Sequence, residues 1–470
     1  AASDVYKRQA LAPSADPGRL PEIEQHIVVD RKKGRLDFSL CPVVRREGRL
    51  QFLVSFMIAV TSQPKPSLKA PSHAGTQRDL TSSEDAAIYA KHSVLREGRW
   101  VKIRVPESGI YQLTSQLARR AGFSDLSRVR IFGYGGNLQN EELHKGDLAA
   151  TDDLPEVAST MVGDRRLFYA KGPVSWENKE ATRRTRNPYS DYGYYFLTET
   201  DGKTPLMVDS AQFIADCYPW ADDYHALREV DNFSWYQGGR NLFENDPIEQ
   251  GKSRTYVFSH PAGENRMANL TIAVTAGAAA SVQYRLNGKD LGNASLRLSS
   301  YNAVVEAENT YKIEHTASDT ITVTTLSGGP VRMDYISYAY ERPKPQPRLA
   351  TDPFPVPEYV YAITNQDHHA DPQADLVIII PTSQKLRPQA ERLAQMHRDR
   401  DSMRVNIVPA DELYNEFSSG TPDANAYRRY LKMLYDRAGD DEAQMPKHLL
   451  LFGDAVWAVS YTHLTLPTNS

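Results

Sequence analysis

The sequence predicts a multidomain chain in which β-rich N-terminal domains precede an α/β unit with a parallel sheet. Short apolar segments separated by turn residues recur up to residue 342. Prolines at alternate positions then mark a stiff linker at 343–347, after which the pattern becomes β-α-β-α-β. The length of 470 residues is typical of about three domains.

These shifts in pattern predict the domain boundaries. We divide the chain into an N-terminal β segment (10–62), a linker (63–93), a β-rich domain (94–229), a β-sandwich or jelly roll (230–342), a proline-rich linker (343–373) and the start of an α/β domain (374–458). Residues 1–9 and 459–470 resemble translated adapter sequences from library preparation, so we exclude both from fold reasoning. We expect residues 10–458 to be cut from a longer gene.

The first half of the chain reads as strands and hairpins. Residues 25–62 predict β-hairpins, with an alternating strand at Leu36–Leu40 and a turn at Arg46–Arg49. In the β-rich domain, Arg99–Val105 alternates as a strand does, Tyr111–Gly122 has the spacing of a short helix, and Val129–Gly133 predicts another strand.

The region 230–342 predicts a sandwich because short strands recur with turns between them. The dipeptide Asn287-Gly288 is a strong signal for a two-residue hairpin. The candidate strands are Tyr256–His260, Ala268–Ala276, Ser281–Leu286, Asn302–Ala307, Ile321–Thr325 and Val331–Tyr340.

The α/β unit opens with Ala374–Pro381, a continuous apolar run that suits a strand buried on both faces. Second and third strands are predicted at Arg404–Val408 and His448–Phe452. The first helix has an apolar face made of Leu386, Ala390, Leu393, Ala394 and His397, and a second helix follows Thr421–Asp423.

Ligands of parallel sheets bind beyond the carboxyl ends of the strands. Gly453 and Asp454 follow the third predicted strand directly, so they are the candidate active-site edge. Asp454 either lines an active site there or serves as a turn or cap residue.

Other chemistry-bearing residues have plainer interpretations. Gly133–Gly136 lacks the lysine of a phosphate-binding loop, which favours a β-turn. Adjacent histidines on an extended backbone point apart, so Asp367–Asp371 is predicted to be a solvated loop and not a metal site. Arg183–Arg186 is also predicted to be solvated, and His397 to be packed with its polar atoms satisfied.

The two cysteines, Cys41 and Cys217, lie far apart and are predicted to be buried or half-buried thiols, with a mutual disulfide as the weaker alternative. No Ser/His/Asp or Cys/His arrangement is visible, and we assign no catalytic, metal or cofactor residue. The net charge of −4 gives no general argument for nucleic acid as a partner. No apolar run reaches the roughly 18–20 residues of a bilayer span.

Several segments resemble the start of a gingipain-family cysteine peptidase domain, which has a caspase-like α/β fold. These segments are Ala374–Pro381, Ala390–His397, Val405–Val408, Leu413–Gly420, Pro422–Arg428 and His448–Asp454. Upstream, Glu97–Thr114 and Val129–Gly136 resemble the β-rich N-terminal region of the sortase-like family member in the type IX secretion system of Bacteroidetes. One departure is Tyr427, where the family has a smaller aliphatic residue.

The resemblance implies a mechanism in which a Cys thiolate, activated by a His, attacks a peptide carbonyl. The family's catalytic His and Cys lie after residue 458, so the chain is expected to be an inactive N-terminal fragment of a cysteine endopeptidase. The implied partners are secreted cargo with a C-terminal signal and outer-membrane components of the secretion system, at the cell surface, and calcium is an implied cofactor. The alternatives are a degradative gingipain-type peptidase and a non-catalytic β-sandwich binding or adhesin protein.

Overall fold

The computed structural model describes residues 23–30, 33–40, 43–46, 49–52, 54, 88–199, 202–235, 241–260, 266–298 and 304–453. It separates into two compact units. One unit comprises residues 1–81 and 440–443, and the other comprises residues 82–439 and 444–470.

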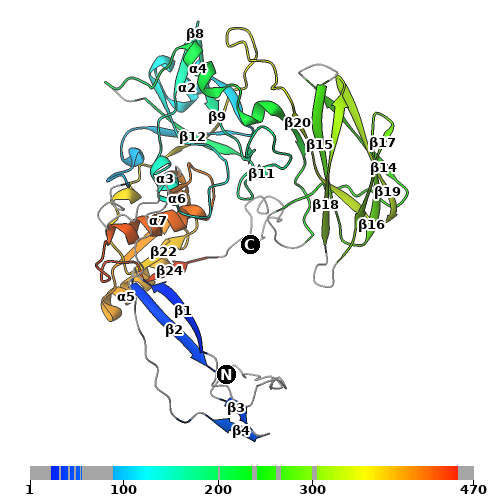
Figure 1. The fold of residues 1–470 in the computed structure, drawn as a ribbon. Coiled ribbons are helices and arrows are strands. Elements are labelled where there is room, and N and C mark those ends of the chain that lie inside the picture. The colour runs from blue at the N-terminus through cyan, green and yellow to red at the C-terminus, as the bar shows by residue number, and fades with distance from the viewer. Residues whose placement is uncertain are drawn as a thin grey trace, which may run out of the picture. The chain divides into compact units, whose positions relative to one another are not determined.

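The first unit contains two β-hairpins (Figure 1). Strand β1 (Ile23–Asp30) pairs antiparallel with β2 (Lys33–Leu40) without a break in register. Strand β3 (Val43–Arg46) pairs with β4 (Arg49–Phe52), which confirms the predicted turn between them. The described strands of this unit are thus the hairpins that the alternation predicts.

Two sheets build the β-rich domain of the second unit. The larger has the strand order β21-β5-β12-β7, with bounds Glu358–Ile363 (β21), Trp100–Val105 (β5), Gly193–Glu199 (β12) and Val129–Phe132 (β7). The smaller has the order β6-β9-β8, with bounds Gly109–Leu113 (β6), Arg165–Ala170 (β9) and Ser159–Val162 (β8). The alternating residues Val101, Ile103 and Val105 are fully buried in the core of this domain.

Short elements connect these strands. They are η1 (Val94–Arg96), α2 (Ser115–Ala121), η2 (Leu126–Arg128), α3 (Lys145–Ala150), β10 (Val174–Ser175), β11 (Thr185–Arg186), α4 (Ser210–Cys217) and η3 (Ala221–Tyr224). The helix predicted over 111–122 is shorter than expected, because the chain as far as Leu113 is strand β6. The Thr114 hydroxyl caps α2 by accepting from the Leu117 amide, and Gly122 ends it at φ 78°.

The predicted proline-rich linker, 343–373, contains ordered elements. Strand β21 pairs antiparallel with β5, more than two hundred residues earlier in the chain, and a 3-10 turn, η4 (His368–Ala370), follows. The sequence prediction missed β21 because the flanking prolines dominate the local composition. The chain therefore returns to the β-rich domain before it enters the α/β unit.

The sandwich has two four-stranded antiparallel sheets, in the orders β13-β20-β15-β18 and β14-β19-β16-β17 (Figure 1). Their bounds are His225–Glu229 (β13), Ser253–Ser259 (β14), Arg266–Ala276 (β15), Ala280–Leu286 (β16), Lys289–Leu296 (β17), Val305–His315 (β18), Ser318–Gly328 (β19) and Val331–Tyr340 (β20). Inward side chains of both sheets, including Ile272, Tyr284 and Val323, form one core without exposed surface. The β-rich and sandwich part of the fold class is thereby confirmed.

The Asn287-Gly288 hairpin is present between β16 and β17. Asn287 has φ 51° and Gly288 has φ 79°, the left-handed conformations that a type I′ turn needs. Strand β17 is absent from the predicted strands because Asp290, Gly292 and Asn293 have low strand propensity. Pairing with β16 forms this strand despite its composition.

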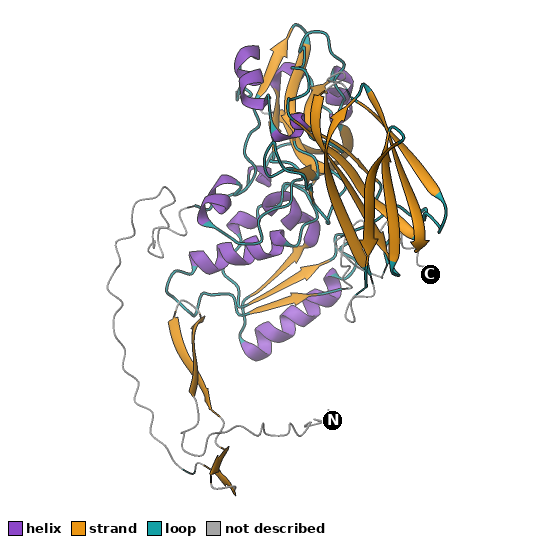
Figure 2. Cartoon of the chain, turned by 45° about the vertical axis from the view of Figure 1, so that its right-hand side comes forward, coloured by secondary structure: helices purple, strands orange, loops and turns teal. Residues whose placement is uncertain are grey.

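The α/β unit has a three-stranded parallel sheet in the order β23-β22-β24, with bounds Val405–Pro409 (β23), Leu376–Ile380 (β22) and His448–Leu451 (β24). Helices cover both faces (Figure 2). Leu376, Ile378 and Ile380 pack against α5 (Arg387–Asp401). Val377 and Ile379 face α6 (Ala410–Phe417) and α7 (Asn425–Arg437). This confirms the parallel unit, although the pattern analysis did not predict α6.

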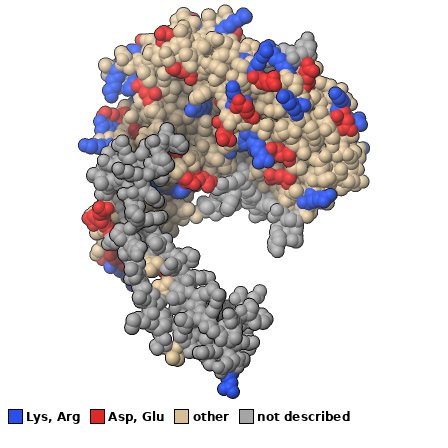
Figure 3. Space-filling model, viewed as in Figure 1, with Lys and Arg blue, Asp and Glu red and all other residues tan. Residues whose placement is uncertain are grey.

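The described surface carries no dominant charge. On the face shown in Figure 3, Lys and Arg side chains are interspersed with Asp and Glu. Among the described residues, no helix is both long and apolar enough to cross a bilayer.

Candidate functional site

The carboxyl edge of the parallel sheet is the first candidate site. Gly453 follows β24 at this edge, beside Pro381 at the end of β22. A Cβ atom on Gly453 would lie 2.9 Å from Pro381 Cγ, so only glycine permits this close approach without a shift. Asp454, the other predicted edge residue, lies outside the described residues.

Carboxylates from α6 lie at the same edge because α6 starts directly after β23. Burial raises the pKa of Asp411, and its Oδ1 atom is buried without a hydrogen-bond partner. Glu412 Oε2 lies 2.8 Å from His368 Nε2, and Gln384 Nε2 donates to Glu412 Oε1 at 3.4 Å. The first turn of α6 thus brings two acidic groups to the edge where ligands of parallel sheets bind.

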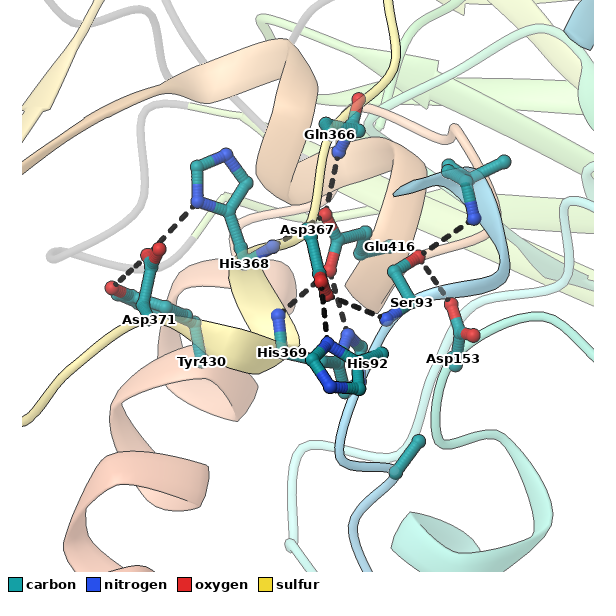
Figure 4. A network of polar contacts seen from close by, with 12 residues as sticks. His92, Ser93, Asp153, Gln366, Asp367, His368, His369, Asp371, Glu416 and Tyr430 are labelled. Atoms are coloured by element: carbon teal, nitrogen blue, oxygen red, sulfur yellow. Dashed lines mark hydrogen bonds and ion pairs between the residues drawn. The ribbon is translucent and has the colours of Figure 1, made fainter. Parts of the chain in front are cut away.

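The predicted solvated loop Asp367–Asp371 is instead a packed polar network (Figure 4). His369 has no exposed surface, and its ring lies between Glu416 Oε2 at 2.6 Å and Asp152 Oδ1 at 3.2 Å. His368 lies between Asp371 and Glu412, with Nδ1 2.9 Å from Asp371 Oδ2. The prediction failed because the carboxylate partners of these histidines are distant in sequence.

Both histidines are cations at neutral pH. Burial opposes protonation of His368, but hydrogen bonds to Asp371 and Glu412 outweigh it and raise its pKa to about 10. For His369, burial is likewise outweighed by hydrogen bonds to Asp152 and Glu416, which raise its pKa to about 9. An imidazolium has no lone pair for a proton or a metal ion. These histidines are therefore suited to holding segments together and not to general-base or metal chemistry.

The same network joins the α/β unit to the β-rich domain. We call these contacts the seam: residues 89–102, 133–153 and 194–196 on one side, and 366–371 and 415–437 on the other. Asp367 accepts from the Ser93 amide at 2.7 Å and lies 2.7 Å from His92 Nδ1. Ser93 also donates to Asp153 Oδ1 at 2.9 Å, which continues the network into the loop before β8.

The glycine loop Gly133–Gly136, for which we expected a β-turn, is part of the seam. The Tyr134 amide donates to Ser419 Oγ at 3.0 Å, and the Ser419 hydroxyl donates to the Tyr194 carbonyl at 3.0 Å. Gly133 has φ 125°, and a Cβ atom there would lie 2.7 Å from Ser419 Oγ. The glycines therefore permit close contact between the two domains.

Lys102 is a seam residue that no sequence pattern singles out. Its ammonium is buried and donates to the Gly420 carbonyl at 2.6 Å and to Asn415 Oδ1 at 3.2 Å. It lies 4.4 Å from the centre of the Tyr194 ring. Burial lowers the pKa of Lys102 to about 7. The alternation of β5 predicts a core strand but not the lysine on its other face.

The predicted solvated cluster Arg183–Arg186 is only partly solvated: Arg183 is exposed, whereas Arg184 and Arg186 are partly buried in ion pairs. Arg184 forms ion pairs with Glu229 and with Asp334, the latter at 3.1 Å, and both carboxylates are nearly inaccessible. Arg186 Nε lies 2.6 Å from Asp231 Oδ2. These pairs tie strand β11 to the sandwich, and their acidic partners lie 43 to 150 residues further along the chain.

The remaining candidate residues, the two cysteines and His397, give no evidence of a catalytic site. Cys217 is buried, and burial raises the pKa of its thiol to about 12, so it is not a nucleophile at neutral pH. Cys41 lies outside the described residues. His397 is satisfied by Asp401 at 2.7 Å but remains partly exposed. In the described part of the chain, no three His, Cys, Asp or Glu side chains are grouped to hold a metal ion.

Comparison with known proteins assigns the α/β unit. Residues 369–469 match the family model described as peptidase family C25. This part of the chain is therefore similar to peptidase family C25. The C25 family is the gingipain family of cysteine peptidases, so the sequence resemblance is confirmed. No curated protein sequence matches the chain.

Among solved structures, the chain is similar to dimeric latent PorU from Porphyromonas gingivalis, with 25% identity and a TM-score of 0.65. The match covers 81% of this chain and 44% of PorU, so the chain spans less than half the length of that protein. The structural match to PorU and the C25 match agree with the expected fold class, in which β-rich domains precede a caspase-like α/β unit.

Two further structural matches cover about a quarter of the chain. They are the Podospora anserina GH26-CBM35 mannanase (17% identity, TM-score 0.19, 26% of this chain and 29% of that chain) and CBM35 from Cellvibrio japonicus Abf62 (17% identity, TM-score 0.17, 24% and 91%). At these scores they carry no functional argument.

Proposed function

We propose that this chain is part of a PorU-like cysteine endopeptidase and sortase. In this proposal the parent enzyme removes C-terminal sorting signals from cargo of the type IX secretion system and transfers the cargo to a surface anchor. The observation that supports it is the joint occurrence of a C25 segment with β-rich domains similar to those of PorU over 81% of the chain. The cargo and outer-membrane components of the secretion system are its proposed partners, at the cell surface.

The seam supports a role for the β-rich domain as a platform for the peptidase domain. The buried, charge-assisted contact of His369 with Asp152 fixes one domain against the other, and Glu416 holds the His369 ring from the α/β side. The Lys102 ammonium makes a further buried contact across the same boundary. A substrate bound on this platform would be held at a fixed position relative to the carboxyl edge of the sheet, as proximity catalysis requires.

We further propose that this chain alone does not cleave peptides. Cysteine peptidases need a thiolate beside a histidine that can accept a proton. The buried thiol of Cys217 has its pKa raised to about 12, and His368 and His369 are already protonated.

The test begins at the gene. The source locus is sequenced with long reads through the codon for Ala458, and the complete protein is expressed. A reporter protein with a C-terminal sorting domain is incubated with the complete enzyme, with a variant lacking the downstream cysteine, and with this chain.

The proposal is supported if the complete enzyme cleaves the reporter before its sorting domain and neither the cysteine variant nor this chain does. Cleavage of any unfolded protein without preference would favour the degradative alternative. A locus that encodes no downstream His and Cys would overturn the peptidase assignment and leave a binding or adhesin protein.

A further inference from the structure

A solvent-open cleft lies where the loop after β7 and helix α3 meet helix α7, with about 830 Å³ of empty space. Its polar lining includes Tyr134, Asn137, Gln139, Thr151, Lys171 and Arg429. Three leucines, Leu138, Leu143 and Leu148, supply an apolar part. No residue that we placed at the carboxyl edge of the parallel sheet lines this cleft.

Arg429 is the unusual group in the cleft. It is 6% exposed, yet the acceptors of its guanidinium are neutral. It donates to Gln139 Oε1 at 2.9 Å, to Thr151 Oγ1 at 2.5 Å and to the Tyr134 hydroxyl at 3.5 Å. No ion pair joins Arg429 to a carboxylate in the described part of the chain. Asp423 is near enough to interact with Arg429 through its charge but forms no ion pair with it. A buried cation without a direct ion pair is costly, so the site gains if an anion enters the cleft and pairs with it.

A second group in the cleft, the side-chain amide of Asn137, indicates what else the ligand contains. Asn137 Oδ1 is buried in the cleft wall without a hydrogen-bond partner. A buried unpaired acceptor gains from an N–H donor. A guanidinium and an amide acceptor in one cleft match the carboxylate and the last N–H of a peptide chain.

The other lining residues narrow the ligand further. The leucines offer a surface for an apolar side chain, and Lys171 adds a second cation. Glu142 and Asp147 also line the cleft, and their negative charges disfavour ligands with several negative charges, such as nucleotides. A single carboxylate with an adjacent apolar group fits this mixed lining.

We propose that the cleft binds the C-terminal end of a peptide whose last side chain is apolar. The carboxylate pairs with Arg429, the last N–H donates to Asn137 Oδ1, and the side chain lies against Leu138 and Leu148. The proposal concerns binding only, so it holds or fails independently of the peptidase assignment.

Titration calorimetry measures the affinity of this chain for N-acetyl-leucyl-leucine. The C-terminal amide of the same peptide and acetate are titrated separately for comparison. We expect the free acid to bind at least tenfold more tightly than the amide, because a charged hydrogen bond is typically worth roughly a tenfold factor or more. Arg429→Gln should lose the same factor. Arg428→Gln is the matched control, because Arg428 precedes it on α7, bonds to Asn425 and does not line this cleft.

Arg429 also joins the loop to α7, so its loss can loosen the fold. Asn137→Leu is therefore a second variant, which removes the free acceptor and leaves the Arg429 contacts in place, and it should weaken binding several-fold at an unchanged melting temperature. Equal affinity for acid and amide, or no binding of either by the folded chain, would overturn the proposal. If acetate binds as tightly as the peptide, the cleft is a general anion site and the proposal of a peptide ligand is refuted.

Discussion

Replacing Glu416 with Gln tests whether the buried ion pair stabilises the seam. Glu416 has no exposed surface and accepts four hydrogen bonds. Oε1 accepts from Gln366 Nε2 at 2.8 Å and from the His368 amide at 2.9 Å, and Oε2 accepts from His369 Nδ1 at 2.6 Å and from the His369 amide at 3.1 Å. A glutamine keeps one carbonyl oxygen, so its amino group must face one of these pairs of donors.

The expected loss of stability in Glu416→Gln follows from the number of hydrogen bonds that Glu416 accepts. The variant leaves two buried donors opposed by another donor and removes one of the two carboxylates that flank the His369 cation. Removing one partner of a buried ion pair costs about 3–5 kcal/mol, and we expect about 3 kcal/mol because Asp152 remains. By the rule of about 1.4 kcal/mol per factor of ten, that is roughly a hundredfold in the opening equilibrium.

The assay is native-state hydrogen exchange of peptides covering α6 and β22, because the chain has several domains and one unfolding free energy does not describe it. Glu391→Gln is the matched control: Glu391 pairs with Arg398 at 3.6 Å on an exposed helix face, and its loss should cost less than about 1 kcal/mol. Exchange in Glu416→Gln that stays within about threefold of the wild type would refute the ion-pair reasoning.

The pH dependence of the seam gives an independent check. The pKa of His369 is about 9 in the folded chain, above its ordinary value of 6.5. Its stabilisation is therefore complete below pH 6.5 and is lost as the pH rises towards 9. Glu416→Gln should flatten this loss, because removing the carboxylate lowers the folded pKa.

Three other changes test separate parts of the fold. The pKa of Lys102 is lowered to about 7 from 10.5, so between these values the unfolded state binds one more proton. The contribution of Lys102 to stability at the seam should therefore rise with pH in this range, opposite in sign to the contribution of His369. Lys102→Met should remove that rise in hydrogen exchange measured from pH 7 to 9. Gly288→Ala should cost about 1–2 kcal/mol by the penalty for a left-handed residue, lowering the melting temperature, whereas Gly146→Ala, with ordinary φ and open space, should not. Arg184→Met leaves its buried carboxylates without a cation and should cost about 3–5 kcal/mol, measured as faster exchange in β13 and β20.

Local pattern was enough to predict most regular elements. The apolar run at Ala374–Pro381 became a strand buried on both faces, and Asn287-Gly288 became the predicted turn. Prediction failed where pairing decided the outcome: β17 forms against β16 despite poor propensity, and β21 completes a sheet whose other strands lie far away in sequence. A strand of this kind is specified by its partner and not by its own composition.

The sequence likewise predicted one part of the candidate site and missed another. The sequence placed Gly453 at the carboxyl edge of a parallel sheet, since strand order along a β-α-β-α-β chain fixes which ends share that edge. It also carried the resemblance to the gingipain family. It did not show that His368 and His369 are buried cations, because the environment of a charged side chain depends on groups brought from far along the chain.

The sequence by itself therefore determined the parallel α/β unit and its resemblance to a peptidase family, because these depend on short-range periodicity and on local strings of residues. Only the tertiary structure decided that Asp152 and Glu416 hold His369, that Ser419 fits against Gly133, and that Arg429 lines a cleft without a direct ion pair among the described residues. Burial and Coulomb interactions act through space, so groups more than two hundred residues apart set each other's charge state once the chain has folded.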